Sequence, residues 1–331
     1  QAANGTNSKD SDRQAIQDEI DQLTTEIDRV SETTKFNETY LLKGEAGTKT
    51  INMKAHDAGL KGTLTDNGDG TATFVMDSLK DGDSVSIGGK TYTIGSKKAD
   101  VDAVVANKVK VAGDKFTVNG QEITIVANYT DKAADQKAGN YTLDDAKALV
   151  KDGATVKLGT DEYKVMTDKD TNGIDDTDAS VISKDVAYNL ASKELLAANQ
   201  IGDTKGSAKV ENTNAKAADG SFKITTGQAE VANSLSFSLH VGADADMTNK
   251  IQVNIDAMDS ASLGIKGLNV KDASGNAATY AVDAISDAIS KVSSQRSSLG
   301  AVQNRLEHTI NNLDNVVENT TTAESRIRDT D

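Results

Sequence analysis

The chain has 331 residues, a net charge of −15, no cysteine, no proline and no tryptophan, and only 37 % of its residues are hydrophobic. These values exclude disulfides, thiol nucleophiles and zinc–thiolate sites, and they argue against nucleic-acid binding, which needs a basic surface. No run of 18 apolar residues occurs, so no segment is predicted to span a membrane, and the low apolar content favours thin or elongated domains with small cores.

A strong amphipathic helix is predicted over residues 11–33. Its apolar residues are spaced alternately by four and three positions, which places them on one stripe of a helix. They are Ile16, Ile20, Leu23, Ile27 and Val30. The next segment, FNETYLLKG at residues 36–44, has apolar residues on both sides of a polar centre. This pattern predicts a short hairpin or loop packed on the helix.

The middle of the chain is rich in Gly, Asp, Thr and Lys, and it contains an internal repeat. Copies start at Gly82, Gly113 and Gly153, and each places apolar residues 3, 5, 10 and 12 positions after its first glycine. Two alternating strands around a glycine-containing turn predict a β-hairpin for each copy. Short helices such as residues 141–151 are expected between copies, and residues 179–199 are predicted to be helical too.

The last hundred residues begin with two alternating segments, LSFSLHV and KIQVNID, which predict a hairpin that packs on the long helices. A helix is then predicted from about Ala277 to Ile327, because apolar residues recur at steps of three or four, apart from one step of seven. They are Ile285, Ile289, Val292, Leu299, Val302, Leu306, Ile310, Leu313 and Val317. Arg296 and Gln303 interrupt this stripe, and in a coiled coil such polar positions fix register and partner.

The expected fold is α+β and elongated, with several domains. Neither long helix can bury its stripe alone, so we expect the two ends to pair in one helical rod domain. Residues 1–50 and 231–331 would form this rod domain. Residues 51–230 would form the inserted β-rich outer part, of one domain or two, built of β-hairpins.

One loop resembles a calcium site. Asp168, Asp170 and Asn172 occupy the first, third and fifth positions of a D-x-D-x-N-G pattern, whose oxygens face one cation in calcium loops. The twelfth position is Ala179, where an EF-hand has a bidentate glutamate, so a solvated acidic turn is the alternative. The three histidines lack metal-site spacing, and no phosphate-binding motif occurs. We therefore expect no enzyme activity and no cofactor.

The two ends of the chain resemble bacterial flagellins. The start is similar to the end of the N-terminal half of that family, and it runs QAANGTNSKDSDRQAIQDEIDQLTTEIDRVSETTKFNETYLLKG. The close is similar to the C-terminal half, and it runs SSLGAVQNRLEHTINNLDNVVENTTTAESRIRDTD. The stretch from LSFSLHV to GIKGLNV resembles the strand region before that last helix. The middle shows no such detailed match.

This resemblance implies a self-assembling structural subunit of the flagellar filament, which serves motility. It implies that the chain is secreted unfolded and works outside the cell. The partners that it implies are other subunits, an export chaperone and a filament cap. The chain starts at Gln1 without an initiator methionine, so we expect a fragment or a processed product. The segments that form the innermost coiled coil of the filament would lie outside it, and we expect the chain not to polymerise alone.

The resemblance also implies a ligand of the innate immune receptor Toll-like receptor five. Glu19 matches the glutamate of the family's QxEI motif, and Gln22 and Glu26 share its helix face. A solvated helix face is the alternative interpretation of these three residues. Arg296 and Gln303 would make lateral contacts between copies.

Two other functions stay open. A flagellin-like hook-junction protein would share both ends and differ in its assembly partners and its copy number. A surface adhesin would bind host ligands through the middle region. An inserted peptidase is disfavoured, because it would need a zinc motif that the middle lacks.

Overall fold

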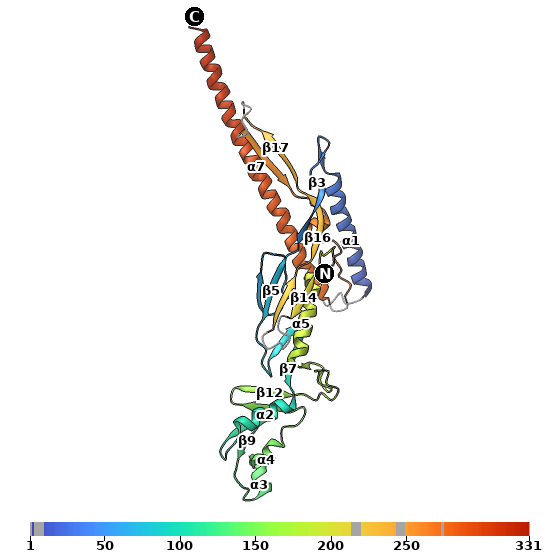
Figure 1. Ribbon diagram of the computed structural model, residues 1–331, viewed down its shortest axis with the longest axis vertical. Coiled ribbons are helices and arrows are strands. Elements are labelled where there is room, and N and C mark those ends of the chain that lie inside the picture. The colour runs from blue at the N-terminus through green and yellow to red at the C-terminus, as the bar shows by residue number, and fades with distance from the viewer. Residues whose placement is uncertain (1, 3–9, 213–219, 243–248, 273–274, 331) are drawn as a thin grey trace. The chain divides into compact units, whose positions relative to one another are not determined.

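The computed structural model describes residues 2, 10–212, 220–242, 249–272 and 275–330 (Figure 1). The chain divides into two units, of which unit 1 comprises residues 1–54, 199–208 and 226–331. Unit 2 comprises residues 55–198 and 209–225. Both units combine helices with sheets, which confirms the mixed α and β class.

The two long helices of unit 1 come from opposite ends of the chain. Helix α1 covers Asp10–Thr33 and helix α7 covers Asn276–Arg328, close to the predicted bounds. With no proline in the sequence, the 53-residue α7 has no residue that removes a backbone N–H from its interior. A third helix, α6 at Ser260–Leu263, is a single turn that ends at Gly264, whose φ of 77° is the left-handed conformation that glycine favours.

A short hairpin follows α1. Strand β1, Lys35–Phe36, pairs with β2, Thr39–Tyr40, and the two turn residues between them, Asn37 and Glu38, both have positive φ. This is the geometry of a tight hairpin turn, so the predicted hairpin is confirmed. The segment contacts α1 as expected, since Ser31 Oγ of the helix donates to Leu42 O at 2.7 Å, but its aromatic residues stay exposed, Phe36 to 73 % and Tyr40 to 44 %.

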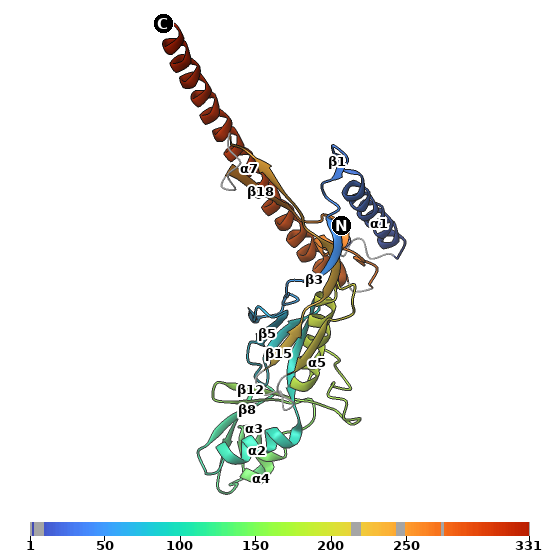
Figure 2. The ribbon, with the colours of Figure 1, turned by 45° about the horizontal axis from the view of Figure 1, so that its top comes forward.

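Two antiparallel pairs of strands complete unit 1. Strand β3, Glu45–Asn52, pairs with β16, Gln228–Asn233. Strand β17, Leu235–His240, pairs with β18, Lys250–Ile255, as predicted for this hairpin. Its inward side chains pack with Leu299 and Val302 of α7, and Figure 2 shows the hairpin lying along that helix. The predicted packing of this hairpin on a long helix is therefore confirmed.

The two long helices share one core in unit 1, but not through the stripe that the sequence indicated. Ile16, Ile20 and Ile27 of α1 pack against a cluster from residues 263–270 and the first turns of α7. The contribution of α7 is a row of small residues, namely Ala278, Ala281, Ala284 and Ala288. The larger residues of its predicted stripe, Ile285, Ile289 and Val292, are exposed. Alanine lets a neighbouring backbone approach closely, so the small residues form the buried face.

Unit 2 contains a four-stranded antiparallel sheet in the order β14-β15-β5-β4. Its strands cover Lys209–Asn212 (β14), Ser221–Thr225 (β15), Thr71–Met76 (β5) and Gly62–Asp66 (β4). Phe74 and Phe222 are fully buried, with ring centroids 6.4 Å apart. Tyr188 of helix α5, Lys184–Asn199, lies at the same distance from Phe222 and adds a third ring to this core.

The three predicted hairpins of the repeat are confirmed in unit 2. They are β6–β7 (Ser84–Ile87 and Lys90–Ser96), β8–β9 (Lys115–Val118 and Gln121–Ile125) and β11–β12 (Thr155–Leu158 and Asp161–Val165). Each pair is antiparallel. With β10, Asn140–Tyr141, and β13, Val181–Ile182, they form one eight-stranded sheet in the order β10-β9-β8-β11-β12-β7-β13, with β6 on β7.

Short helices pack beside this sheet. They are α2 (Lys98–Lys108), α3 (Lys132–Lys137) and α4 (Leu143–Lys147). Val101 and Val105 of α2 join Phe116, Ile123 and Val156 of the hairpins in one buried cluster. The helices predicted near residues 141–151 and 179–199 correspond to α4 and α5.

Candidate functional site: an assembly surface in unit 1

An apolar stripe runs along the first half of α7. Val282, Ile285, Ile289 and Val292 are spaced by three, four and three positions, so they lie on one side of the helix. All four are exposed, Ile289 to 61 %. The row of buried alanines lies on the adjacent side, so α7 has a covered face and an uncovered apolar face in the same turns.

Exposed apolar side chains are concentrated in unit 1. In the part of the chain that the structure describes, all but two of the large apolar side chains that are exposed belong to this unit. The two exceptions are Val75 and Val111 of unit 2. Scattered apolar side chains are normal on a surface, whereas a contiguous stripe marks an interaction site.

The residues predicted to face a receptor lie on the exposed side of α1. Glu19, Gln22 and Glu26 are all exposed, and their spacing places them on one face of the helix. Glu26 is paired with Arg29, whose guanidinium donates to both carboxylate oxygens at 2.5 and 2.7 Å. The hydrogen bond from Arg29 lowers the pKa of Glu26 below its ordinary value.

The two polar residues predicted to interrupt the α7 stripe are also exposed. Arg296 makes no hydrogen bond or ion pair with any residue that the structure describes, so its five N–H donors remain available to a partner. Gln303 donates to Glu307, one turn further along, at 2.9 Å. Their role in contacts between copies stays a prediction.

The calcium loop is closed by its own hydrogen bonds. Asp168 accepts from the backbone of Gly173 at 3.0 Å, Asp170 accepts from the side chain of Asn172 at 2.8 Å, and Asn172 accepts from the backbone of Ile174 at 2.7 Å. Among described residues, no cluster of three or more histidine, cysteine or acidic side chains could hold a metal ion. Calcium binding stays a prediction, which a titration with Asp168→Asn as control would test.

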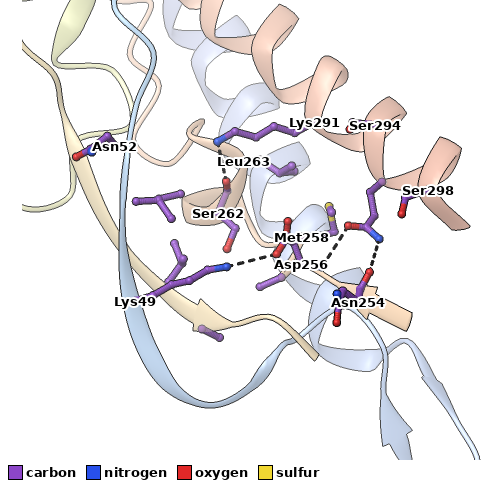
Figure 3. Close-up of a pocket in the computed structure, with 15 residues that line it drawn as sticks. Lys49, Asn52, Asn254, Asp256, Met258, Ser262, Leu263, Lys291, Ser294 and Ser298 are labelled. Atoms are coloured by element: carbon purple, nitrogen blue, oxygen red, sulfur yellow. Dashed lines mark hydrogen bonds and ion pairs between the residues drawn. The ribbon is translucent and has the colours of Figure 1, made fainter. Parts of the chain in front are cut away.

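A cavity of about 500 Å³ lies within unit 1, between α7, α6, β18 and the β3–β16 pair (Figure 3). Its wall is partly apolar, with Met258 and Leu263, and two lysines, Lys49 and Lys291, reach it from opposite sides. Gln295 closes one side, because its amide donates to Asn254 O at 2.9 Å and accepts from Asp256 N at 3.3 Å.

Sequence reasoning missed this cavity. Its residues come from four separated stretches of the chain, and none of them forms a motif. The only local signal is Lys291, a charged residue one position before Val292 of the predicted apolar stripe. No helix in the described ranges is both long and apolar enough to cross a bilayer.

Comparison with known proteins gives matches at both ends of the chain. The family model described as the bacterial flagellin N-terminal helical region matches residues 1–47, and that of the bacterial flagellin C-terminal helical region matches residues 282–331. Both matched segments fall in unit 1, the unit that carries the apolar stripe.

Relatives extend the similarity over the whole chain. A flagellin of Clostridium tyrobutyricum is 29 % identical over all of this chain and 67 % of its own length. Flagellin B of Vibrio anguillarum is 32 % identical over all of this chain and 64 % of its own length. A flagellin of Bacillus subtilis (strain 168) is 43 % identical over 38 % of this chain and 46 % of its own length. The chain thus spans about two thirds of the curated relatives that it matches from end to end.

Helices from both ends of the sequence, the two matched regions, meet in unit 1. By these matches the chain is similar to bacterial flagellins, which are structural proteins of flagella, at both ends and along its whole length. The resemblance inferred from the two ends of the sequence is confirmed.

Proposed function

We propose that this chain is part of a structural subunit of the bacterial flagellar filament, which works outside the cell. The observation that carries the proposal is the concentration of exposed apolar side chains in unit 1, the unit with both family matches. A monomeric protein has no use for such a stripe, whereas a subunit covers it on assembly. Contacts between unlike patches of identical subunits generate open helical filaments.

The experiment is a count of this protein in purified flagella. Filaments sheared from cells would be separated from the hook and basal parts, and the protein would be quantified by mass spectrometry with isotope-labelled peptides. A filament subunit is the main component of the sheared fraction. A hook-junction protein would instead be present at a few copies per filament, and that result would overturn the proposal.

The outer position of residues 51–230 is a second part of the proposal. Neither of the two matching family models reaches them, which fits a surface that varies while the assembling ends do not. Antibodies against a peptide of 51–230 should decorate intact filaments. Antibodies against residues 282–292 should bind only dissociated subunits, because assembly would cover the stripe. Equal decoration by both would contradict this arrangement.

The partners implied by the resemblance are proposed with the function. An export chaperone and a filament cap would act on the full-length protein. Toll-like receptor five would bind the α1 face that carries Glu19, Gln22 and Glu26. This face is exposed and continuous, which supports the proposal. Receptor-reporter cells should respond less to Glu19→Lys than to Asp12→Lys, an exposed control near the start of the same helix. Equal responses would count against the assignment.

A further inference from the structure

The cavity between α7, α6, β18 and the β3–β16 pair contains a lysine, Lys291, whose ammonium makes one hydrogen bond and no close ion pair among the described residues. Lys291 Nζ donates to Ser262 O at 3.1 Å, and it forms no ion pair with any residue that the structure describes. An ammonium group has three donors, so two remain for a partner. Burial lowers the pKa of Lys291 below its ordinary value, although Asp287 and Asp256 attract its ammonium.

A second polar group in the cavity is also unsatisfied. Ser262 is only 8 % exposed, and its hydroxyl oxygen is buried without a hydrogen-bond partner among the described residues. Its side chain points toward the cavity from α6, below the Lys291 ammonium (Figure 3). A buried hydroxyl without a partner costs free energy, so native proteins rarely keep one unless something binds there.

The second lysine of the cavity is held at its edge. Lys49 Nζ donates to Ser234 Oγ at 2.7 Å and lies 3.4 Å from Asp256 Oδ1. Three lysines, Lys49, Lys54 and Lys291, therefore face two aspartates, Asp256 and Asp287, which leaves one positive charge in excess around the cavity. An anion next to Lys291 and Ser262 would meet an ammonium and a hydroxyl donor, with apolar surface from Met258 and Leu263 nearby.

We propose that this cavity receives the carboxylate of an acidic side chain from a second copy of the chain, and that Glu38 at the tip of the β1–β2 hairpin supplies it. The net charge of −15 makes another copy a rich source of carboxylates. A carboxylate accepts from both donors at once, and charge-assisted hydrogen bonds of this kind are the strong ones.

The β1–β2 hairpin offers a free carboxylate and two exposed aromatic rings. Glu38 is exposed, and it makes no hydrogen bond or ion pair with any described residue. Phe36 and Tyr40 stand exposed on either side of it and would cover the apolar wall of the cavity. The volume of about 500 Å³ admits one such aromatic ring together with a carboxylate. Hairpin and cavity are different patches of unit 1, so their contact is head-to-tail and continues from copy to copy.

This contact rests on the proposed filament function, and the test separates the two. The full-length protein that carries this sequence would be polymerised as wild type, Glu38→Lys, Lys291→Glu and the double variant. Each single variant should raise the critical concentration about tenfold, as expected for the loss of a charge-assisted contact, and the double variant should restore it. Glu32→Lys, an exposed change on α1, is the matched control and should assemble as wild type.

The assembly test stays interpretable even if one of the variants folds poorly. Glu38 lies in an exposed turn, so Glu38→Lys leaves the core intact even if Lys291→Glu perturbs unit 1. If wild type forms no filaments, the proposed function and this contact both fall. If wild type assembles and Glu38→Lys assembles equally well, the contact alone is overturned.

A crosslink provides an independent readout. The chain has no cysteine, so cysteines introduced into it at single positions pair only with each other. Mixed filaments of Thr39→Cys and Ser294→Cys subunits should form disulfide-linked dimers on mild oxidation, because hairpin and cavity would lie within bonding distance. The control mixture of Thr39→Cys and Ser238→Cys, an exposed position on β17, should not. Equal crosslinking in both mixtures would overturn the assignment.

Discussion

Replacing Gln17 with alanine should destabilise unit 1 far more than its polar side chain suggests. Gln17 lies on α1 and is only 5 % exposed. Its amide nitrogen donates to Leu268 O at 2.8 Å, and its amide oxygen accepts from Val270 N at 2.8 Å. The side chain therefore pairs with residues 268–270 as a neighbouring strand would, and it fixes that segment against α1.

The magnitude follows from the two backbone groups that the substitution leaves behind. Leu268 and Val270 are 5 % and 2 % exposed, so water does not replace the lost partner without a rearrangement. Each buried, unsatisfied group costs about 1–3 kcal/mol, so with two such groups Gln17→Ala should lower the free energy of unfolding by roughly 2–6 kcal/mol. That is a large part of the total stability of a domain, which is about 5–15 kcal/mol.

Urea unfolding followed by far-ultraviolet circular dichroism suits this test. Helices α1 and α7 hold 24 and 53 residues, so the helical signal reports mostly on unit 1. With a slope of about 2 kcal/mol per molar urea, the midpoint should fall by roughly 1–3 M. The control is Gln14→Ala, an exposed position on the same helix whose amide bonds only the side chains of Asp18 and the exposed Lys271 and no buried backbone group. If the two variants shift the midpoint equally, the hydrogen bonds from Gln17 to residues 268–270 add no stability and the reasoning is wrong.

Three further predictions concern single side chains. Ile289→Asp should keep the free energy of unfolding within about 0.5 kcal/mol of wild type, since the residue is exposed. It should nevertheless abolish filament growth of the full-length protein, whereas the adjacent exposed control Ser290→Asp should not. Lys291→Met should stabilise unit 1 by roughly 0.5–1 kcal/mol at neutral pH, because burial lowers the pKa of Lys291. The unfolded chain holds this proton to higher pH than the folded chain, so the stability that wild type lacks relative to Lys291→Met should be regained as pH rises towards 10.5. Phe222→Ala should lower the free energy of unfolding of unit 2 by about 3–5 kcal/mol. In calorimetry the transition of unit 2 should move to lower temperature while the transition of unit 1 stays unchanged.

Local patterns were sufficient to predict the hairpins. In each repeat copy, strand alternation and a glycine turn lie within thirteen neighbouring residues, so sequence and structure agree at Val85, Ile123 and Val156, for example. Both long helices were predictable for the same reason, because their periodicity is continuous along the chain. Such features depend on neighbours in the sequence and not on the rest of the fold.

The buried face of α7 was not predictable in this way. Alanines at 278, 281, 284 and 288 and larger residues at 285, 289 and 292 both recur at helical spacing. Hydrophobicity alone favours the larger residues as the core, whereas the structure buries the alanines, because residues 263–270 pack close to the helix there. Which stripe is buried depends on the partner, and the sequence of one helix does not contain the partner.

Buried polar groups were missed for a related reason. Gln17 and Ser262 are polar residues of the kind that usually lie at the surface, and nothing next to them in the sequence marks them as buried. Their burial arises from contacts across more than two hundred residues of chain, as between Gln17 and Val270. Such residues become visible only when each buried donor and acceptor is assigned a partner.

The two units differ in how many of their surface groups find partners within the same unit. This difference predicts which unit makes the assembly contacts. Unit 2 binds its turn carboxylates internally: Asp175, only 4 % exposed, accepts from the backbones of Thr167, Thr177 and Asp178 at 2.7–3.0 Å. Unit 1 keeps an exposed apolar stripe, and its Lys291 forms no close ion pair with the residues that the structure describes. Substitution of the exposed unit 2 residue Val111 by lysine should therefore leave filament growth unchanged. Impaired growth, measured against Ile289→Asp in the same sedimentation assay, would place assembly contacts in unit 2 and contradict this division of roles.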